Sequence, residues 1–362
     1  MGRNRPCKVF WGHLADFSAR SASNVTGGQA SRLSAVVYSL VVGAKAGPSV
    51  RSALRPSANW SLAGAQTRRA GGRRSNDFSM HRNCGYGFRF TISHRMKILF
   101  SEHKSDYAHY QFPYAVWAFP EPGETPADLF NAGFLPSSRN LDRFYLCRHI
   151  RLSLAAFKPS TENRRIIRKG AGIAVKLVPR ADFAYTPEKR AFYKTYADIK
   201  FGKDVMTFER LDSLFGSPLI SHLLVFTDTT TGAEIGTAML HLEGKALAYY
   251  YYAFYDLNYY SRNLGMFMMT SAVALFAEKG VRHLYLGTCY SRNALYKTQF
   301  AGAQFFNGLH WSSDLAELKF ILERDKKEIY SHLLEAAEYT QKFHEDGVPA
   351  LAAASPFRVK LG

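Results

Sequence analysis

The sequence predicts an α/β protein with a mixed central sheet flanked by helices, a small α+β N-terminal subdomain and a disordered N-terminal extension. Residues 173–312 favour this class because they read as strand, helix, helix, hairpin, strand, helix, strand, helix, strand. The stretch 248–300 at its centre reads as a strand, a glycine-marked turn, a helix and a second strand. Such a βαβ unit makes its two strands parallel, so the sheet has mixed strand directions.

Charge separates the extension from the rest of the chain. Residues 1–95 carry 15 Lys and Arg against two acids, so they supply +13 of the net +18, and residues 96–362 supply only +5. Their Arg, Ser, Gly and Ala content, with no sustained period, is typical of a disordered tail, a transit peptide or a segment outside the functional protein. We expect the folded protein to start at Met96 and to be cytoplasmic, or organellar if the extension is a targeting signal.

Three further regions follow: an N-terminal subdomain at 96–172, a central domain at 173–312, and a C-terminal helix and tail at 313–362. The four cysteines form no CxxC pair, so we expect no disulfide framework and no metal site. No run of 18 apolar residues is present, and we therefore expect no membrane span.

Local patterns predict the elements of residues 96–172. The segment 97–100 favours a strand, and 110–119 an edge strand or loop because of Pro113. A short helix ends near Gly133, where a C-cap glycine belongs. One strand then covers 144–157, and Pro159 and Ser160 start a helix. That helix gathers four cations on about two turns; they are Arg164, Arg165, Arg168 and Lys169.

The central domain and tail are predicted in the same way. The expected strands are 172–178, the hairpin 219–244, 246–256, 283–290 and 303–311. The expected helices are 186–201, 208–216, 264–280, 291–302 and a long helix over 314–343. Helix 264–280 is apolar nearly all round and should be buried.

Several segments together resemble known families. The layout is similar to that of the GNAT acyltransferases. The segment ADLFNAGF followed by RHIRLSLAAFKPSTENRRIIRKG resembles the first domain of the arginyl/leucyl-tRNA–protein transferases. The series YYAFYD, NLG and YLGTCYSRNALYKTQF resembles motifs of the same family, and the match extends over most of 96–310. That family usually has a cysteine cluster before the basic helix, whereas only Cys147 stands there, which indicates a divergent branch.

The resemblance implies an enzyme that moves Arg or Leu from charged tRNA to the N-terminal amine of an acceptor protein, as in N-degron tagging. It implies a monomer without a cofactor, with tRNA and a protein N-terminus as partners. An acetyl-CoA-dependent N-acyltransferase and a non-catalytic RNA-binding module of the same fold are the alternatives. Against acetyl-CoA, the position of a small residue in the pyrophosphate-binding turn holds Phe267, whose bulk should crowd that group.

The implied chemistry needs positioning more than a strong base. An α-amine has a pKa of about 7.7–8.0, so much of it is neutral near pH 7.4. The main demand is then a donor for the developing oxyanion. The candidates are the backbone at Leu264 and Gly265 and the hydroxyls of Tyr251, Tyr290 and Tyr296, although tyrosines in sheets also serve as packing residues.

Further side chains are expected to bind substrate. Lys297 is expected to act at the reacting centre, and Lys297 and Arg292 to meet an acidic acceptor residue. Tyr251, Tyr252, Arg262, Asn263 and Arg292 form the expected substrate-binding set. The four cations of the basic helix are expected to contact the tRNA backbone. Cys289 is expected to be a small buried residue rather than a nucleophile.

Overall fold

The computed structural model describes residues 96–362 except 109–110, 330, 356 and 358–362. The predicted extension at 1–95 lies outside the described residues. All the described residues fall within one compact unit, and the subdomain limits drawn from the sequence stay a prediction. No helix among the described residues is long and apolar enough to cross a membrane.

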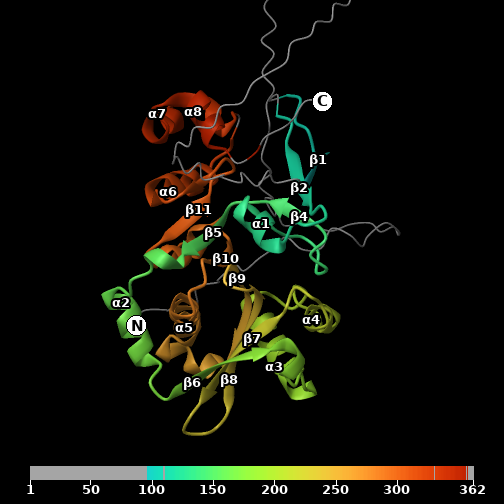
Figure 1. Cartoon of the computed structure of the whole chain (residues 1–362), viewed down its shortest axis with the longest axis vertical. Coiled ribbons are helices and arrows are strands. Elements are labelled where there is room, and N and C mark those ends of the chain that lie inside the picture. Colours follow the sequence, from blue (N-terminus) through green and yellow to red (C-terminus); the bar gives the residue numbers. More distant parts are fainter. Residues whose placement is uncertain (1–95, 109–110, 330, 356, 358–362) are drawn as a thin grey trace, which may run out of the picture. The chain divides into compact units, whose positions relative to one another are not determined.

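One eight-stranded sheet dominates the fold, in the order β12-β11-β5-β10-β9-β8-β7-β6 (Figure 1). One half of the sheet consists of four consecutive strands, each antiparallel to the next: β6 (Ile173–Pro179), β7 (His222–Asp228), β8 (Glu234–Glu243) and β9 (Leu247–Tyr255). Helix α5 (Leu264–Glu278) then leads into β10 (His283–Thr288), which pairs parallel to β9. Four antiparallel strands, a helix and a parallel fifth strand are the GNAT layout, so the predicted fold class is confirmed.

Strand β5 (His149–Ser153) extends this sheet by lying between β10 and β11 (Ala303–Phe306), antiparallel to both. β12 (Trp311–Ser312) closes that edge. A strand from the predicted N-terminal subdomain is therefore part of the large sheet.

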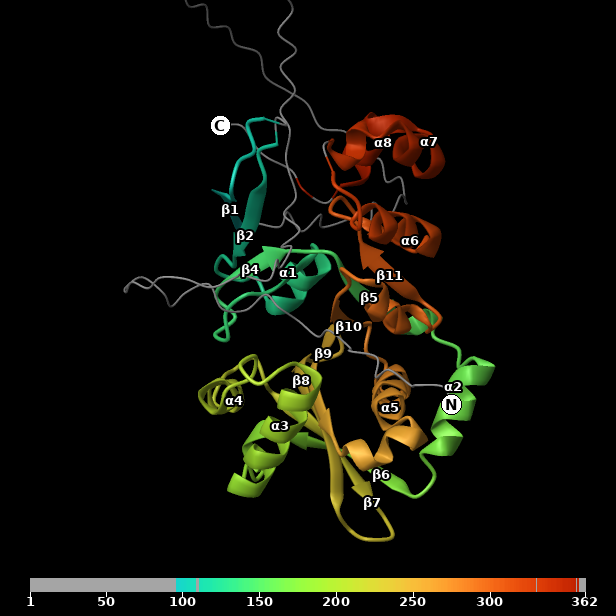
Figure 2. The ribbon, with the colours of Figure 1, turned by 180° about the vertical axis from the view of Figure 1, so that it is seen from behind.

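Helices cover both faces of the sheet (Figure 2). Each face has its own hydrophobic cluster. On what we call the α5 face, α5 is buried nearly all round, and α2 (Thr161–Lys169) packs beside it. On the opposite face, which we call the α3/α4 face, lie α3 (Pro187–Lys200) and α4 (Phe208–Phe215). Helix α2 begins at the predicted cap, because the Ser160 side chain accepts from Asn163 N.

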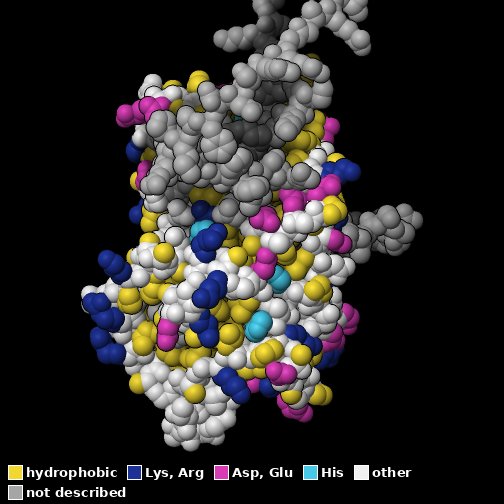
Figure 3. All heavy atoms as spheres, in the orientation of Figure 1, with side chains coloured by type: hydrophobic (Ala, Val, Ile, Leu, Met, Phe, Trp, Pro, Cys, Tyr) yellow, Lys and Arg dark blue, Asp and Glu magenta, His cyan; other side chains and the backbone are white. Residues whose placement is uncertain are grey.

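Helix α2 presents its cations to solvent. Arg164, Arg168 and Lys169 are exposed, and Arg165 is half-exposed. Figure 3 shows Lys and Arg side chains gathered along the edge where α2 lies. Two of the four cations have local partners. Arg165 donates to the Glu162 carboxylate through Nε at 2.6 Å and through Nη2 at 2.5 Å. Arg164 donates to the Pro159 carbonyl oxygen at 2.7 Å.

A second sheet, in the order β1-β2-β4-β3, precedes the large one. Its elements are β1 (Lys97–Glu102), β2 (Tyr114–Phe119), α1 (Pro126–Asn131), β3 (Phe134–Pro136) and β4 (Phe144–Leu146). The segment 110–119, predicted as an edge strand or loop, contains the strand β2, which starts just after Pro113. Because β2 pairs with β1 on one side and with β4 on the other, it is not an edge strand.

The single strand predicted over 144–157 was wrong. It is two strands in different sheets, β4 and β5, followed by the 3-10 turn η1 (Leu154–Ala156). The break falls at Cys147 and Arg148, where the Arg148 amide donates to the Tyr290 hydroxyl instead of to a strand neighbour.

Three predictions near the C-terminus were also wrong. The helix expected at 291–302 is a 3-10 helix, η4 (Arg292–Thr298). The strand expected at 303–311 is divided into β11 and β12 by a turn in which Gly308 has a φ of 98°. The long helix is divided into α6 (Leu315–Arg324), η5 (Leu333–Glu335) and α7 (Ala337–Phe343), with α8 (Gly347–Ala354) after them. The chain turns back after Asp325, so both halves of the apolar pattern reach the core.

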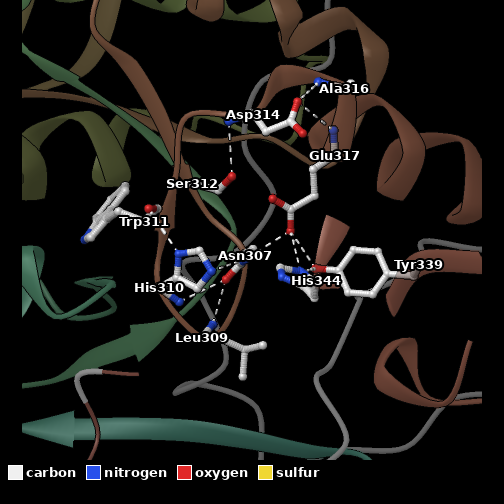
Figure 4. A network of polar contacts seen from close by, with 10 residues as sticks. All are labelled: Asn307, Leu309, His310, Trp311, Ser312, Asp314, Ala316, Glu317, Tyr339 and His344. Carbon is white, nitrogen blue, oxygen red and sulfur yellow. Dashed lines mark hydrogen bonds and ion pairs between the residues drawn. The ribbon is translucent and has the colours of Figure 1, made fainter. Parts of the chain in front are cut away.

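The buried carboxylate of Glu317 links the C-terminal helices through polar contacts (Figure 4). Glu317 of α6 is 2% exposed, and it accepts from Asn307 Nδ2 at 3.0 Å and from the Tyr339 hydroxyl at 2.6 Å. His344 Nε2 lies 3.4 Å from the same oxygen. Because buried polar groups must be satisfied, this cluster ties α6 and α7 to the turn after β11.

Candidate active site

The two parallel strands of the central βαβ unit part at their carboxyl ends. Their pairing ends at Tyr249 and Tyr285. Beyond this point β9 stays with β8 up to Tyr255, and β10 stays with β5 up to Thr288. Ligands of α/β sheets bind beyond the carboxyl ends of the strands. We call this place the β9–β10 divergence.

Both strands carry an irregularity where they part. In β9, Leu240 pairs with Tyr250 and Ala238 with Ala253, so Tyr251 and Tyr252 together face Met239. This bulge puts both tyrosines on the α3/α4 face, with ring centroids 4.4 Å apart. The predicted substrate-binding pair therefore lies side by side at the divergence.

On the β10 side, Lys297 returns from η4 to the end of the strand. It is only 4% exposed, and its Nζ donates to the Thr288 carbonyl oxygen at 2.8 Å. Gly287, which lies next to this amine, has a φ of 78°, a left-handed backbone conformation that favours glycine. Burial lowers the pKa of Lys297 to about 8.

Cys289 is fully buried beside this lysine, as the sequence predicted. Burial raises the pKa of its thiol. A protonated, buried thiol is a poor nucleophile, so its role is packing.

Arg148, which sequence reasoning missed, fixes the loop after β10. Its amide donates to the Tyr290 hydroxyl at 2.8 Å, its Nε donates to the Cys289 carbonyl oxygen at 2.9 Å, and its guanidinium pairs with Asp325. The guanidinium also lies 4.7 Å from the centre of the Tyr290 ring. The alternating pattern of 144–157 gave no sign that this arginine is 1% exposed.

Two of the three candidate hydroxyls, those of Tyr290 and Tyr296, lie on opposite sides of the sheet. Tyr290 packs against the cluster of the α3/α4 face. Tyr296 packs against the α5-face cluster, where burial, and then Tyr250 and Tyr255, raise its pKa. The structure therefore places Tyr290 on the same face of the sheet as Tyr251 and Tyr252, and Tyr296 on the opposite face, near Tyr250 and Tyr255.

That first turn is closely covered. Leu264 is fully buried, and a Cβ on Gly265 would lie 3.0 Å from the Tyr255 ring. Asn263 adopts a left-handed φ of 58°, and its carbonyl accepts from Phe267 N at 2.9 Å. Gly265 has no side chain, and this allows the Tyr255 ring to pack directly against the first turn of α5.

The predicted cations around the site have separate partners. Arg262 Nη2 donates to the Ala171 carbonyl oxygen at 2.8 Å, which ties the turn before α5 to the end of α2. Arg292 pairs with Glu323 of α6 and its side chain is 61% exposed. Lys297 is buried, so the structure does not bring Arg292 and Lys297 together as one cationic site.

Phe267 has a different environment from the one predicted. Its ring is 5% exposed and points at α2, where a Cβ on Gly170 would lie 2.0 Å from it. The ring is therefore a packing group between α2 and α5. The ring does not project into solvent at the turn before α5. The prediction that it would crowd a pyrophosphate there was therefore wrong.

Cys147 and His149, at the start of β5, are buried next to each other. Cys147 Sγ lies 3.6 Å from His149 Nδ1. Burial raises the pKa of Cys147 and lowers that of His149 to about 3. Among the described residues, no group of three or more His, Cys, Asp or Glu side chains is placed to hold a metal ion.

Comparison with known proteins gives partial matches. Over 174 residues the chain is 26% identical to an aspartate/glutamate leucyltransferase of Ruegeria pomeroyi, covering 46% of this chain and 62% of the relative. Over 182 residues it is 26% identical to the enzyme of that name from Xanthomonas euvesicatoria, covering 68% of it. No family model matches. The chain is similar to these leucyltransferases, and it spans less than two thirds of the length of the first of them.

Solved structures give weaker likenesses. A GCN5-related N-acetyltransferase from Sphaerobacter thermophilus aligns with 53% of this chain and 57% of its own at 17% identity, with a TM-score of 0.28. FemX aligns with 39% of this chain and 53% of its own at 10% identity, with a TM-score of 0.30.

We predict that Gly170→Ala destabilises the protein by about 1–3 kcal/mol, the usual cost of overpacking. The new methyl group would overlap the Phe267 ring, while the φ of −86° at Gly170 suits alanine. Urea unfolding measures the loss, and Gly216→Ala, whose nearest contact would be 3.4 Å, is the control. In a Phe267→Ala background the loss should vanish. An equal loss in both backgrounds would exclude the contact as its cause.

We predict that Lys297→Met stabilises the fold at pH 7. The pKa of about 8 in the folded state is below the ordinary 10.5, so the unfolded chain holds the proton more tightly. The cost of the buried ammonium is complete below pH 8 and is relieved as pH rises from 8 to 10.5. Removing it should raise the free energy of unfolding by up to about 3 kcal/mol. Chemical unfolding of both proteins at pH 7 and pH 10 measures this, and a variant less stable at pH 7 would contradict it.

Proposed function

We propose that this protein is an aminoacyl-tRNA–protein transferase that moves leucine, or alternatively arginine, from charged tRNA to the N-terminal amine of an acceptor protein. The similarity to aspartate/glutamate leucyltransferases carries the proposal. The matches span 62% of the first relative, so donor, acceptor and partners all belong to the proposal.

The geometry of the β9–β10 divergence supports acyl transfer by positioning. The reaction forms an amide bond between the amine nitrogen and the aminoacyl carbonyl carbon, and the tRNA 3′ oxygen leaves. At neutral pH a fraction of the amine is already unprotonated, and the ester is activated. What the protein must add is orientation and a counter-charge for the oxyanion.

Lys297 is the group we assign to that counter-charge. Its amine lies at the carboxyl end of β10, in a buried setting where one charge acts strongly. The protein keeps an ammonium there despite its cost in stability, which is typical of a functional group. Tyr251, Tyr252 and Tyr290 then shape the acceptor side of the divergence.

The two faces of the sheet separate the two substrates in this proposal. The exposed cations of α2, on the α5 face, contact the tRNA backbone. The acceptor approaches from the α3/α4 face, and the reacting groups meet where β9 and β10 part. No cofactor takes part. An acetyl-CoA-dependent N-acyltransferase is the second candidate, because the GNAT layout is common to such enzymes.

The decisive experiment incubates the full chain with labelled Leu-tRNA or Arg-tRNA and peptides that begin with Asp, Glu, Arg or Lys. We expect transfer of one amino acid to at least one peptide class, with at least a tenfold loss in Lys297→Met as an oxyanion partner is removed. Acetyl-CoA with the same peptides is the parallel arm. Acetyl transfer without aminoacyl transfer would replace the proposal with the second candidate.

A second measurement tests α2. We predict that replacing Arg164, Arg165 and Arg168 by Ala weakens tRNA binding and flattens its dependence on salt. Each lost phosphate contact should reduce the slope of log K against log salt by roughly 0.7–0.9. The matched control replaces three exposed lysines of other elements, namely Lys176, Lys245 and Lys279. An unchanged slope in the α2 variant would remove this helix from the RNA interface.

A further inference from the structure

Tyr255, the last residue of β9, lies where the two faces of the sheet come together. It packs against both hydrophobic clusters, that of the α5 face and that of the α3/α4 face. The tyrosines discussed above are different, because Tyr296 packs against the cluster of the α5 face and Tyr290 against that of the α3/α4 face. Since β9 ends at Tyr255, its side chain has neighbours from both layers of helices.

A helix from each face contacts the Tyr255 ring, and Figure 1 shows these two helices, α3 and α5, on either side of the sheet. From α3, the Tyr196 ring lies with its centroid 4.8 Å from that of Tyr255. From α5, Gly265 lies against the tip of the ring, and a Cβ there would be 3.0 Å from the Tyr255 hydroxyl oxygen. Tyr255 is half-buried. Its hydroxyl is therefore fixed at the first turn of α5, at the margin of the core.

The surroundings of this hydroxyl suit a proton donor. Burial raises the pKa of Tyr255, and the Tyr196 hydroxyl acts in the opposite direction. The phenol is therefore protonated at neutral pH. The positive end of the α5 dipole lies beside the hydroxyl, and no acidic side chain in the first turn of α5 offsets it. Negative charge that passes to the phenol oxygen during a reaction is thus stabilised.

Tyr255 and Lys297 belong to the same site. Tyr296 precedes Lys297 in η4, and its pKa is raised by burial and then by Tyr250, Tyr255 and Cys289. Burial raises the pKa of Cys289, and the charge of Lys297 opposes this. Such effects require groups that lie close together. Tyr255 at the end of β9 and Lys297 at the end of β10 are therefore linked through Tyr296 and Cys289 across the divergence.

We propose that Tyr255 is a catalytic residue whose hydroxyl gives its proton to the tRNA 3′ oxygen as the aminoacyl ester breaks. The inference rests on the proposed function and adds to it the group that serves the leaving oxygen, whereas Lys297 serves the carbonyl oxygen. In the proposed function the two substrates come from opposite faces of the sheet. Tyr255 is in contact with helices of both faces, so it lies where the substrates have to meet.

The bonds and protons of this step balance. The amine nitrogen bonds to the carbonyl carbon, and the bond between that carbon and the 3′ oxygen breaks, with its electron pair left on the oxygen. This oxygen takes the proton of Tyr255. The proton that the nitrogen loses as it becomes an amide returns to the phenolate, so none is gained or lost and no co-reactant is needed. Proton donation of this kind accelerates a reaction by about a hundredfold to ten-thousandfold.

Tyr255→Phe tests the proposal, because it removes the hydroxyl and keeps the ring that packs on Gly265. The full chain, in excess over labelled Leu-tRNA or Arg-tRNA, is mixed with peptides that begin with Asp, Glu, Arg or Lys, and the rate of a single turnover is measured. We expect this rate to fall by at least about a hundredfold, with the affinity for tRNA unchanged. Tyr260→Phe, at an exposed tyrosine of η3, is the matched control and should keep the full rate.

A more acidic phenol separates proton donation from packing. Difluorotyrosine at position 255 has nearly the shape of tyrosine but loses its proton at a lower pH. Because the unmodified phenol has a raised pKa, wild-type protein keeps this donor throughout the neutral range. We expect the single-turnover rate of the fluorinated protein to begin to fall at a lower pH than that of the wild type. Difluorotyrosine at position 260 should leave the pH profile unchanged.

The outcomes separate this inference from the proposed function. Wild-type protein that transfers no amino acid would overturn the proposed function, and the role of Tyr255 with it. Transfer by the wild type together with an unchanged rate in Tyr255→Phe would overturn the inference alone. Slower transfer by Tyr255→Phe, with a pH profile that fluorination does not alter, would overturn it in favour of packing. Urea unfolding identifies a variant that fails to fold, and if Tyr255→Phe does, the pH profile of the fluorinated protein decides.

Discussion

The buried charge of Arg148 is the constraint on which the site depends. Its guanidinium has to be satisfied away from water, and three groups do so: the Cys289 carbonyl, the Asp325 carboxylate and the face of the Tyr290 ring. These groups come from the loop after β10 and from the end of α6. A buried arginine that lost its carboxylate would cost about 3–5 kcal/mol, so the loop and the helix end are held together. Tyr290 is held in place by these contacts, close to the Thr288 carbonyl oxygen to which Lys297 donates.

The tyrosines at the site are divided between the two faces of the sheet. Tyr250 and Tyr296 belong to the α5 face, while Tyr251, Tyr252 and Tyr290 belong to the α3/α4 face. Desolvation raises the pKa values of Tyr250, Tyr251 and Tyr296, so these three phenols are neutral at physiological pH. Because these phenols are neutral, the charge at the divergence comes from cations such as the buried Lys297.

Local patterns predicted the elements whose environment is local. The Ser160 cap, the glycine after α1 and the buried character of α5 could all be read from the sequence. Features that depend on a distant partner could not. The contact of Phe267 with Gly170, the burial of Arg148 and the break in the predicted helix 314–343 are each decided by a segment far away in the chain.

The bulge in β9 has a consequence for the length of the strand. Before it, odd-numbered side chains such as Tyr249 face α3 and α4; after it, even-numbered ones such as Phe254 do. A strand one residue shorter at Tyr251 or Tyr252 would keep every flanking side chain on its present face, whereas a deletion elsewhere in β9 would turn half of the strand inside out. The sheet is therefore complete without one of these two tyrosines. The extra residue of the bulge can be lost without turning the rest of the strand over, and it lies where β9 and β10 separate.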